Sequence, residues 1–119
     1  AEENYDEALE LARKIDREAT ESDWADVLRF PLLGVPVSIK DQLIQKGFDA
    51  TMGSACRCFQ WGSDGASEDG FAVKLLKEAG AVPVVRSNTQ QALMLPESAN
   101  NVWGTSRNPY DGKRTPGGS

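Results

Sequence analysis

Lys40 is the residue whose type and position first suggest chemistry. It ends a segment in which the apolar residues Val35, Val37 and Ile39 alternate, and it is followed at once by Asp41. In α/β proteins, ligands gather at the carboxyl ends of the strands. A lysine shielded from water at such a place loses proton affinity and can act as a neutral general base. The alternative is that the Lys40 amine only extends from a strand end into solvent, and position alone leaves both interpretations open.

Ser119 is the second candidate, because it follows Gly117 and Gly118. Glycines allow unusual backbone dihedrals and close approach of other groups. Their free N–H groups can also bind an anion or an oxyanion. A flexible Gly/Ser segment explains the same three residues equally well, so this interpretation also stays open.

The residue types that are missing narrow the chemistry further. The chain contains no His, which removes the commonest general base and the commonest metal ligand. The only cysteines are Cys56 and Cys58, and a C-x-C pair without His or further Cys cannot complete a four-ligand zinc site. We therefore expect no metal and no cofactor. We expect two free thiols, which favour a reducing, cytoplasmic location.

Charge is concentrated at the start of the sequence. The 119 residues carry a formal net charge of −5, and residues 1–29 hold ten acidic and four basic side chains. The remainder, 30–119, is nearly neutral and lacks the basic cluster that a nucleic-acid surface needs. The sequence shows neither an apolar run of membrane-spanning length nor a secretory leader.

Hydrophobic periodicity predicts the elements that would position these residues. Apolar residues at spacings of three and four predict a helix over 5–21. Alternation predicts a strand over 35–40, and a second helix follows from Asp69-Gly70 to Ala79 with Gly80 as its C-cap. With a short apolar strand over 81–85, this makes a βαβ unit with parallel strands. We expect loop over 47–69, a short helix near 89–95 and loop from Pro96 onward.

Taken together, several segments resemble the amidase signature family of serine hydrolases. The segments, in colinear order, are 31–41 (PLLGVPVSIKD), 51–54 (TMGS), 69–82 (DGFAVKLLKEAGAV), 87–91 (SNTQQ), 104–110 (GTSRNPY) and 115–119 (TPGGS). The resemblance implies an α/β fold, with a mixed sheet flanked by helices. It also implies that residues 1–119 are the N-terminal part of an amidase domain, with an acidic helical lead-in over 1–29 and a core segment over 30–119.

The resemblance assigns roles to individual residues. The family cleaves amides with a Ser–cis-Ser–Lys triad, in which Lys40 matches the catalytic lysine and Ser119 the bridging serine beside a cis peptide. Leu93 matches a position lining the acyl-binding channel of fatty acid amide hydrolases, although plain core packing explains an apolar residue there equally well. Gly117 and Gly118 would help to place the strained serine next to the substrate.

One part of that machinery lies outside the sequence. In the family, the acylating serine follows the bridging serine in a second Gly-rich segment, so we expect this chain alone to be inactive. The resemblance is strongest to fatty acid amide hydrolases, and then to A subunits of glutamyl-tRNA amidotransferases. It implies a small-molecule amide substrate, no nucleic-acid partner unless the protein is a transamidase, and a homodimer as one possible assembly. A non-catalytic α/β interaction domain is the alternative from a different class.

Overall fold

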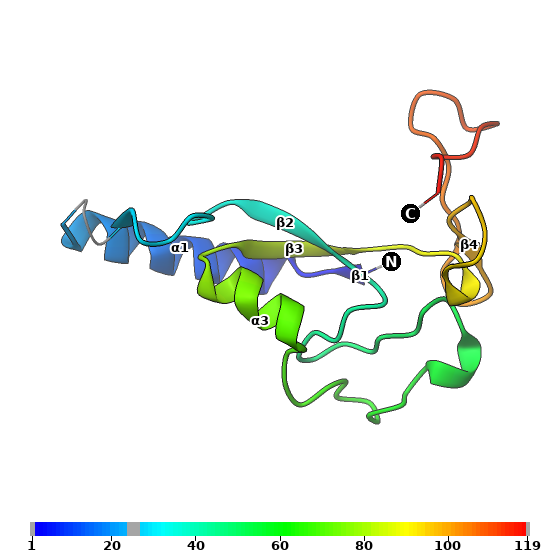
Figure 1. The fold of residues 1–119 in the computed structure, drawn as a ribbon, viewed down its shortest axis with the longest axis horizontal. Helices are drawn as coiled ribbons and strands as arrows, with labels where there is room; N and C mark the ends of the chain where they lie inside the picture. The colour runs from blue at the N-terminus through cyan, green and yellow to red at the C-terminus, as the bar shows by residue number, and fades with distance from the viewer. Residues whose placement is uncertain (1, 24–26, 119) are drawn as a thin grey trace. The chain divides into compact units, whose positions relative to one another are not determined.

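The computed structural model describes residues 2–23 and 27–118 (Figure 1). The elements, in chain order, are β1 (Glu2–Glu3), α1 (Tyr5–Glu21), β2 (Pro36–Lys40), η1 (Ala55–Arg57), α3 (Phe71–Glu78), β3 (Val82–Ser87), η2 (Gln91–Leu93), β4 (Ala99–Asn100) and β5 (Gly104–Thr105). They divide between two compact units. We call residues 2–39 and 71–86, apart from 24–26, the helical unit, and residues 40–70 and 87–118 the loop unit.

The helical unit contains the helix that the sequence predicts over 5–21, since α1 runs from Tyr5 to Glu21. Its apolar stripe packs only in part. Ala8 is buried, whereas Tyr5 is 57% exposed and Leu9 is 50% exposed. The helix is joined to β3 at its start, because the Asn4 N–H donates to the Val84 carbonyl O at 3.0 Å.

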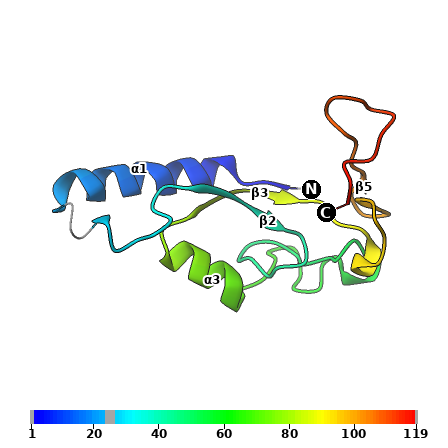
Figure 2. The ribbon, with the colours of Figure 1, turned by 45° about the horizontal axis from the view of Figure 1, so that its top comes forward.

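The predicted βαβ unit is confirmed as β2, α3 and β3. The Val82 N–H donates to the Val35 carbonyl and the Asp41 N–H to the Ser87 carbonyl, so β2 and β3 run in the same direction. Gly80 ends α3 as predicted, with φ +93°. The Ala81 N–H donates back to the Leu76 carbonyl at 3.0 Å, which is the six-to-one bond of a Schellman cap. Both helices run alongside the strands in Figures 1 and 2.

A strand that the sequence analysis does not predict completes this sheet. β1 pairs antiparallel with β3, placing Glu2 opposite Arg86, and the strand order is β1-β3-β2. The Arg86 side chain is fully buried, and its Nε lies 3.1 Å from Glu2 Oε2. The pairing makes the sheet mixed, as the fold resemblance implies.

The loop unit is irregular, as the composition predicts, but it is not free of structure. A parallel bridge joins Lys46 to Ala66. One 3-10 turn, η1, interrupts the predicted loop 47–69, and β4 pairs antiparallel with β5 in the region expected to be loop. The short helix expected near 89–95 is reduced to the three residues of η2.

Candidate functional site

Lys40 lies where the sequence predicts it, at the last residue of β2, and it is half-buried. The strand ends there because the Leu43 N–H donates to the Lys40 carbonyl O at 2.9 Å and turns the chain. The next residue, Asp41, donates its N–H to the carbonyl O of Ser87, the last residue of β3, at 3.0 Å. Hydrogen bonds therefore hold the backbone at the Lys40 carbonyl and at the Asp41 N–H, where the strand ends.

The carboxylate of Asp41 is completely buried, and hydrogen bonds from residues 51–53 reach it. Its Oδ2 accepts from the Thr51 hydroxyl at 2.7 Å and from the Gly53 N–H at 3.3 Å. Its Oδ1 accepts from the Thr51 N–H at 3.4 Å. A buried carboxylate needs such donors, because an ion without them is costly to bury.

The hydroxyl of Thr51 links this carboxylate to a distant part of the loop unit. While it donates to Asp41, its oxygen accepts from the Gly53 N–H at 3.1 Å and from the indole N–H of Trp103 at 3.3 Å. A hydroxyl has one proton to donate and two lone pairs. Thr51 therefore uses its full hydrogen-bonding capacity inside the protein.

Asn100 fixes the turn that brings Trp103 into place. Its side-chain oxygen accepts from the Val102 N–H at 2.9 Å and from the Trp103 N–H at 2.7 Å. Its amide nitrogen donates to Asn88 Oδ1 at 2.7 Å and to the Thr89 carbonyl O at 2.6 Å. The side chain thus joins the β4–β5 turn to the segment that follows β3.

Backbone strain gathers in the same unit. Met52 (φ +51°), Ala92 (φ +51°) and Leu93 (φ +62°) all lie in the left-handed region, which non-glycine residues rarely adopt. The Ala92 N–H donates to the Met52 carbonyl at 3.0 Å, so the two strained segments are bonded to each other. Strained residues of this kind cluster at ligand sites and switch regions.

Leu93, the predicted acyl-channel residue, is half-buried and ends η2. The two apolar side chains that follow it are exposed to solvent, Met94 to 82% and Leu95 to 55%. Gln90 holds this segment by donating its side-chain amide to the Leu95 carbonyl O at 2.6 Å.

The glycine pair has backbone dihedrals that only glycine adopts readily. Gly117 has φ +98° and Gly118 has φ +100°, conformations that side-chain-bearing residues avoid. A Cβ on Gly118 would lie 3.6 Å from the Pro96 carbonyl carbon, which places this segment next to the residues that follow Leu93. Ser119, and with it the peptide bond that joins it to Gly118, lies outside the described residues. Among residues 2–23 and 27–118 no peptide bond is cis.

The two cysteines are free thiols, as predicted. Burial raises the pKa of the Cys58 thiol, and the nearby charges of Asp49, Asp41 and Cys56 raise it further. Cys58 is therefore a poorer nucleophile at neutral pH than an ordinary cysteine. No three Cys, Asp or Glu side chains in the described part of the chain come together as a metal site would require, and no helix described there could cross a bilayer.

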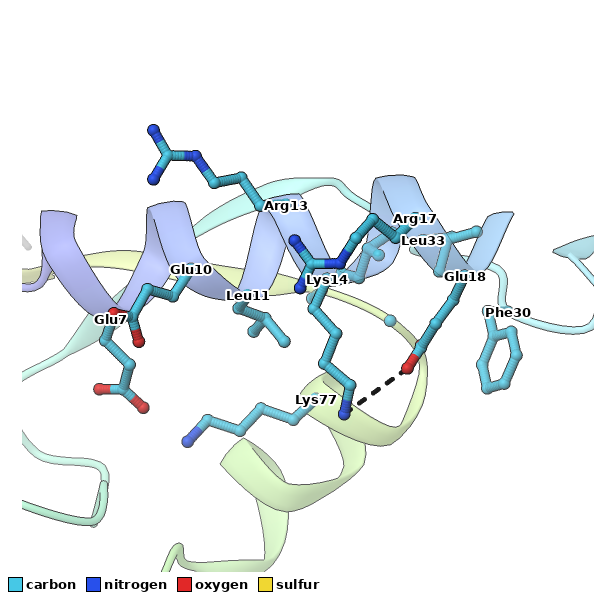
Figure 3. A pocket seen from close by; sticks show the side chains of 13 residues that line it. Glu7, Glu10, Leu11, Arg13, Lys14, Arg17, Glu18, Phe30, Leu33 and Lys77 are labelled. Atoms are coloured by element: carbon cyan, nitrogen blue, oxygen red, sulfur yellow. Dashed lines mark ion pairs between the residues drawn. The ribbon is translucent and has the colours of Figure 1, made fainter. Parts of the chain in front are cut away.

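A hollow of about 840 Å³ lies in the helical unit, and residues of that unit alone line it. Its walls are charged side chains of α1 and Lys77 of α3, and Leu11, Phe30 and Leu33 line it as well (Figure 3). One ion pair bridges part of the wall, between Lys14 Nζ and Glu18 Oε1 at 3.7 Å. Lys40, Leu93, Gly117 and Gly118 do not line it.

The structure thus places Lys40, Leu93, Gly117 and Gly118 in one compact unit. The sequence analysis missed the polar groups that organise this unit: Thr51, Gly53, Asn88, Asn100 and Trp103. A partial signal was present, because Thr51-Met52-Gly53 belongs to the segments that carry the resemblance and Asn100-Asn101 lies in the region expected to be loop. Nothing in the spacing indicated that these segments meet beside Asp41.

Comparison with known proteins identifies the family. The sequence model of the Amidase family matches residues 1–119. Amidase 1 of Gibberella moniliformis is 42% identical over 115 residues, which cover 97% of this chain and 21% of that protein. Fatty acid amide hydrolase 1 of Caenorhabditis elegans is 37% identical over 108 residues, covering 87% of this chain and 18% of the relative.

Two further matches bear on the fold and on the reaction. The glutamyl-tRNA(Gln) amidotransferase A subunit of Desulfatibacillum aliphaticivorans is 36% identical over 114 residues, covering 96% of this chain and 22% of the relative. The crystal structure of the peptide amidase from Stenotrophomonas maltophilia superposes with a TM-score of 0.77 at 27% identity, covering 98% of this chain and 23% of that one.

These matches confirm the amidase-signature resemblance and the mixed α/β fold as an N-terminal portion of that architecture. This chain spans about a fifth of the length of the curated relatives it matches. Residues 1–119 belong to the amidase family.

Proposed function

We propose that the complete protein is an amide-cleaving serine hydrolase whose base is Lys40. The observation that carries this proposal is the match of the Amidase family along the whole chain, which includes Lys40 at the carboxyl end of β2. The coarse activity, hydrolysis of amides, is common to the amidases among the relatives.

The proposed mechanism is a proton relay. A neutral Lys40 amine takes the proton of the Ser119 hydroxyl, and Ser119 takes the proton of the acylating serine, which lies outside this chain. That serine attacks the amide carbonyl, the amine leaves with a proton returned through the relay, and water then cleaves the acyl-enzyme. A lysine acting through a serine does here what His does in other hydrolases, which accounts for a sequence without His.

We propose that the remaining candidates bind the substrate. Gly117 and Gly118, both with positive φ, would help to place Ser119 next to the substrate carbonyl, and the Gly117 N–H donates to the Thr115 hydroxyl at 3.2 Å. Leu93 would contact the acyl part of the amide, and a fatty acyl chain fits the exposed apolar side chains of Met94 and Leu95 beside it. A small amide, and no cofactor, completes this proposal.

Replacement of Lys40 in the complete enzyme tests it. We expect Lys40→Ala to slow labelling of the acylating serine by a fluorophosphonate probe by at least about 100-fold, since positioned acid–base groups contribute that much. Lys46→Ala is the matched control, because Lys46 is an exposed lysine of the same unit. Unchanged labelling of Lys40→Ala would remove Lys40 from the mechanism.

Transamidation is the second candidate, and the 36% identity to an amidotransferase A subunit favours it specifically. Such an enzyme needs partner subunits and an ammonia acceptor on an aminoacyl-tRNA, whereas the hydrolase would act alone or as a homodimer with water as acceptor. Purification of the complete protein from its source decides between them. Other subunits that co-elute would favour the transamidase, and an active single-chain species the hydrolase.

A further inference from the structure

We infer that Thr51 is a positioning residue for Lys40, acting through the carboxylate of Asp41. The inference rests on the proposed role of Lys40 as base. It is carried by the hydrogen bonds that converge on Asp41 and by the complete use of the Thr51 hydroxyl.

Lys40 and Asp41 are consecutive residues of the chain. The two residues share a peptide bond, and the Lys40 carbonyl O and the Asp41 N–H are both hydrogen-bonded, to the Leu43 N–H and the Ser87 carbonyl O. The buried Asp41 carboxylate is thus attached to the backbone segment that carries the Lys40 amine, and its hydrogen bonds help to hold that segment in one position. A displacement of about 1 Å in a catalytic group is enough to slow a reaction by two orders of magnitude.

Hydrogen bonds from residues 51–53 hold the Asp41 carboxylate. Of the three contacts that its oxygens make with residues 51–53, the Thr51 hydroxyl bond at 2.7 Å is the shortest. A short bond to a carboxylate is the strong, charge-assisted kind. The Thr51 hydroxyl is thus the principal tie between the Asp41 carboxylate and this segment.

The hydrogen bonds of the Thr51 hydroxyl leave it no direct chemical role. Its proton is held by Asp41, and its lone pairs accept from Gly53 and Trp103. A hydroxyl engaged in this way has no proton or lone pair left for a substrate. The group orients, and Trp103 fixes it from the side of the β4–β5 turn.

The test uses the complete enzyme and the rate of fluorophosphonate labelling, separated into the maximal rate (kinact) and the concentration for half-maximal rate (KI). Thr51→Val keeps the shape and removes the hydroxyl. We expect it to lower kinact by about 10- to 100-fold and to leave KI within about twofold, because positioning affects the reaction and not binding of the probe. Thr51→Ser restores the hydroxyl and should restore kinact. Thr105→Val, at an exposed threonine of β5, is the control and should match the wild type.

Trp103→Phe provides a second variant in case Thr51→Val does not fold, as judged by its melting curve. It removes the indole N–H together with part of the ring, leaves the Thr51 hydroxyl in place, and should lower kinact by a smaller factor. Wild-type kinact in both Thr51→Val and Trp103→Phe, or a kinact that Thr51→Ser does not restore, would overturn the inference. Lys40→Ala, assayed in parallel, separates this failure from failure of the proposed function. An inactive Lys40→Ala beside an unimpaired Thr51→Val rejects only the role of Thr51.

Discussion

Gly53 is a position where a single methyl group would disturb the hydrogen-bond network beside Lys40. Its φ of +68° is a conformation that costs a non-glycine residue about 1–2 kcal/mol. A Cβ there would also lie 2.9 Å from Asn100 Cβ, closer than real Cβ atoms approach. Since Asn100 is held by four hydrogen bonds, it cannot move aside without breaking the turn that carries Trp103.

We therefore expect Gly53→Ala to lower the free energy of unfolding of the complete protein by about 2 kcal/mol or more, measured by chemical denaturation. Gly62→Ala is the matched control. Gly62 has φ +78° in the same unit, but nothing lies within 4 Å of its Cβ position, so it carries only the backbone cost. Equal destabilisation by the two substitutions would show that contact with Asn100 is unimportant.

At the same scale, the sequence located the candidate base but not its surroundings. Lys40 could be placed at a strand end because alternation over 35–40 is a local pattern. The bonds from Thr51 and Trp103 could not be predicted, because they join residues ten and 52 positions apart in the chain. Contacts of this kind depend on how the loops fold back, which turn residues alone do not specify.

At the scale of elements, prediction succeeded wherever a local period or cap defines the element. The helix 5–21 and the Gly80 cap are of this kind. β1 was missed because two residues have no period, and their strand identity comes only from pairing with Val85 and Arg86. The β4–β5 pair was missed for a related reason, because its two-residue strands also have no period. A residue outside the pair helps to hold it, since the side-chain amide of Asn88 donates to the carbonyl oxygens of both Ser98 and Gly104 at 3.3 Å.

The pairing of β1 with β3 leads to a prediction about its ion pair. The Arg86 side chain is fully buried and that of Glu2 is 28% exposed. Glu2→Gln removes the charge and keeps the shape, so we expect it to lower the free energy of unfolding by about 1.5–3 kcal/mol, as for a hydrogen bond between charged groups. Glu3→Gln, the exposed neighbour in the same strand, should change it by less than about 0.5 kcal/mol. Urea denaturation of the complete protein measures both, and a Glu2→Gln loss no larger than that of Glu3→Gln would show that the pair does not stabilise the sheet.

At the scale of the whole molecule, the buried apolar groups are small. Among the described residues they are Ala8, Ile39, Ala50, Ala66, Val73, Ala81 and Val82, of which four are alanines. Several large apolar side chains are instead exposed to solvent, Phe59 to 76%, Phe71 to 79% and Leu28 to 79%. Burial of large apolar side chains supplies most of the stability of a domain, and here little of it is available.

We therefore expect residues 1–119, produced alone, to lack a cooperative melting transition and to bind the dye ANS, as loosely packed chains do. The same sample should not react with a fluorophosphonate probe at any serine, because the proposed acylating serine is absent and Lys40 and Ser119 only relay protons. Circular dichroism, dye fluorescence and mass spectrometry of the treated chain measure these outcomes, with the complete protein as the positive control. A sharp transition without dye binding would show that this small core is sufficient for folding, and a labelled serine would place a nucleophile within residues 1–119.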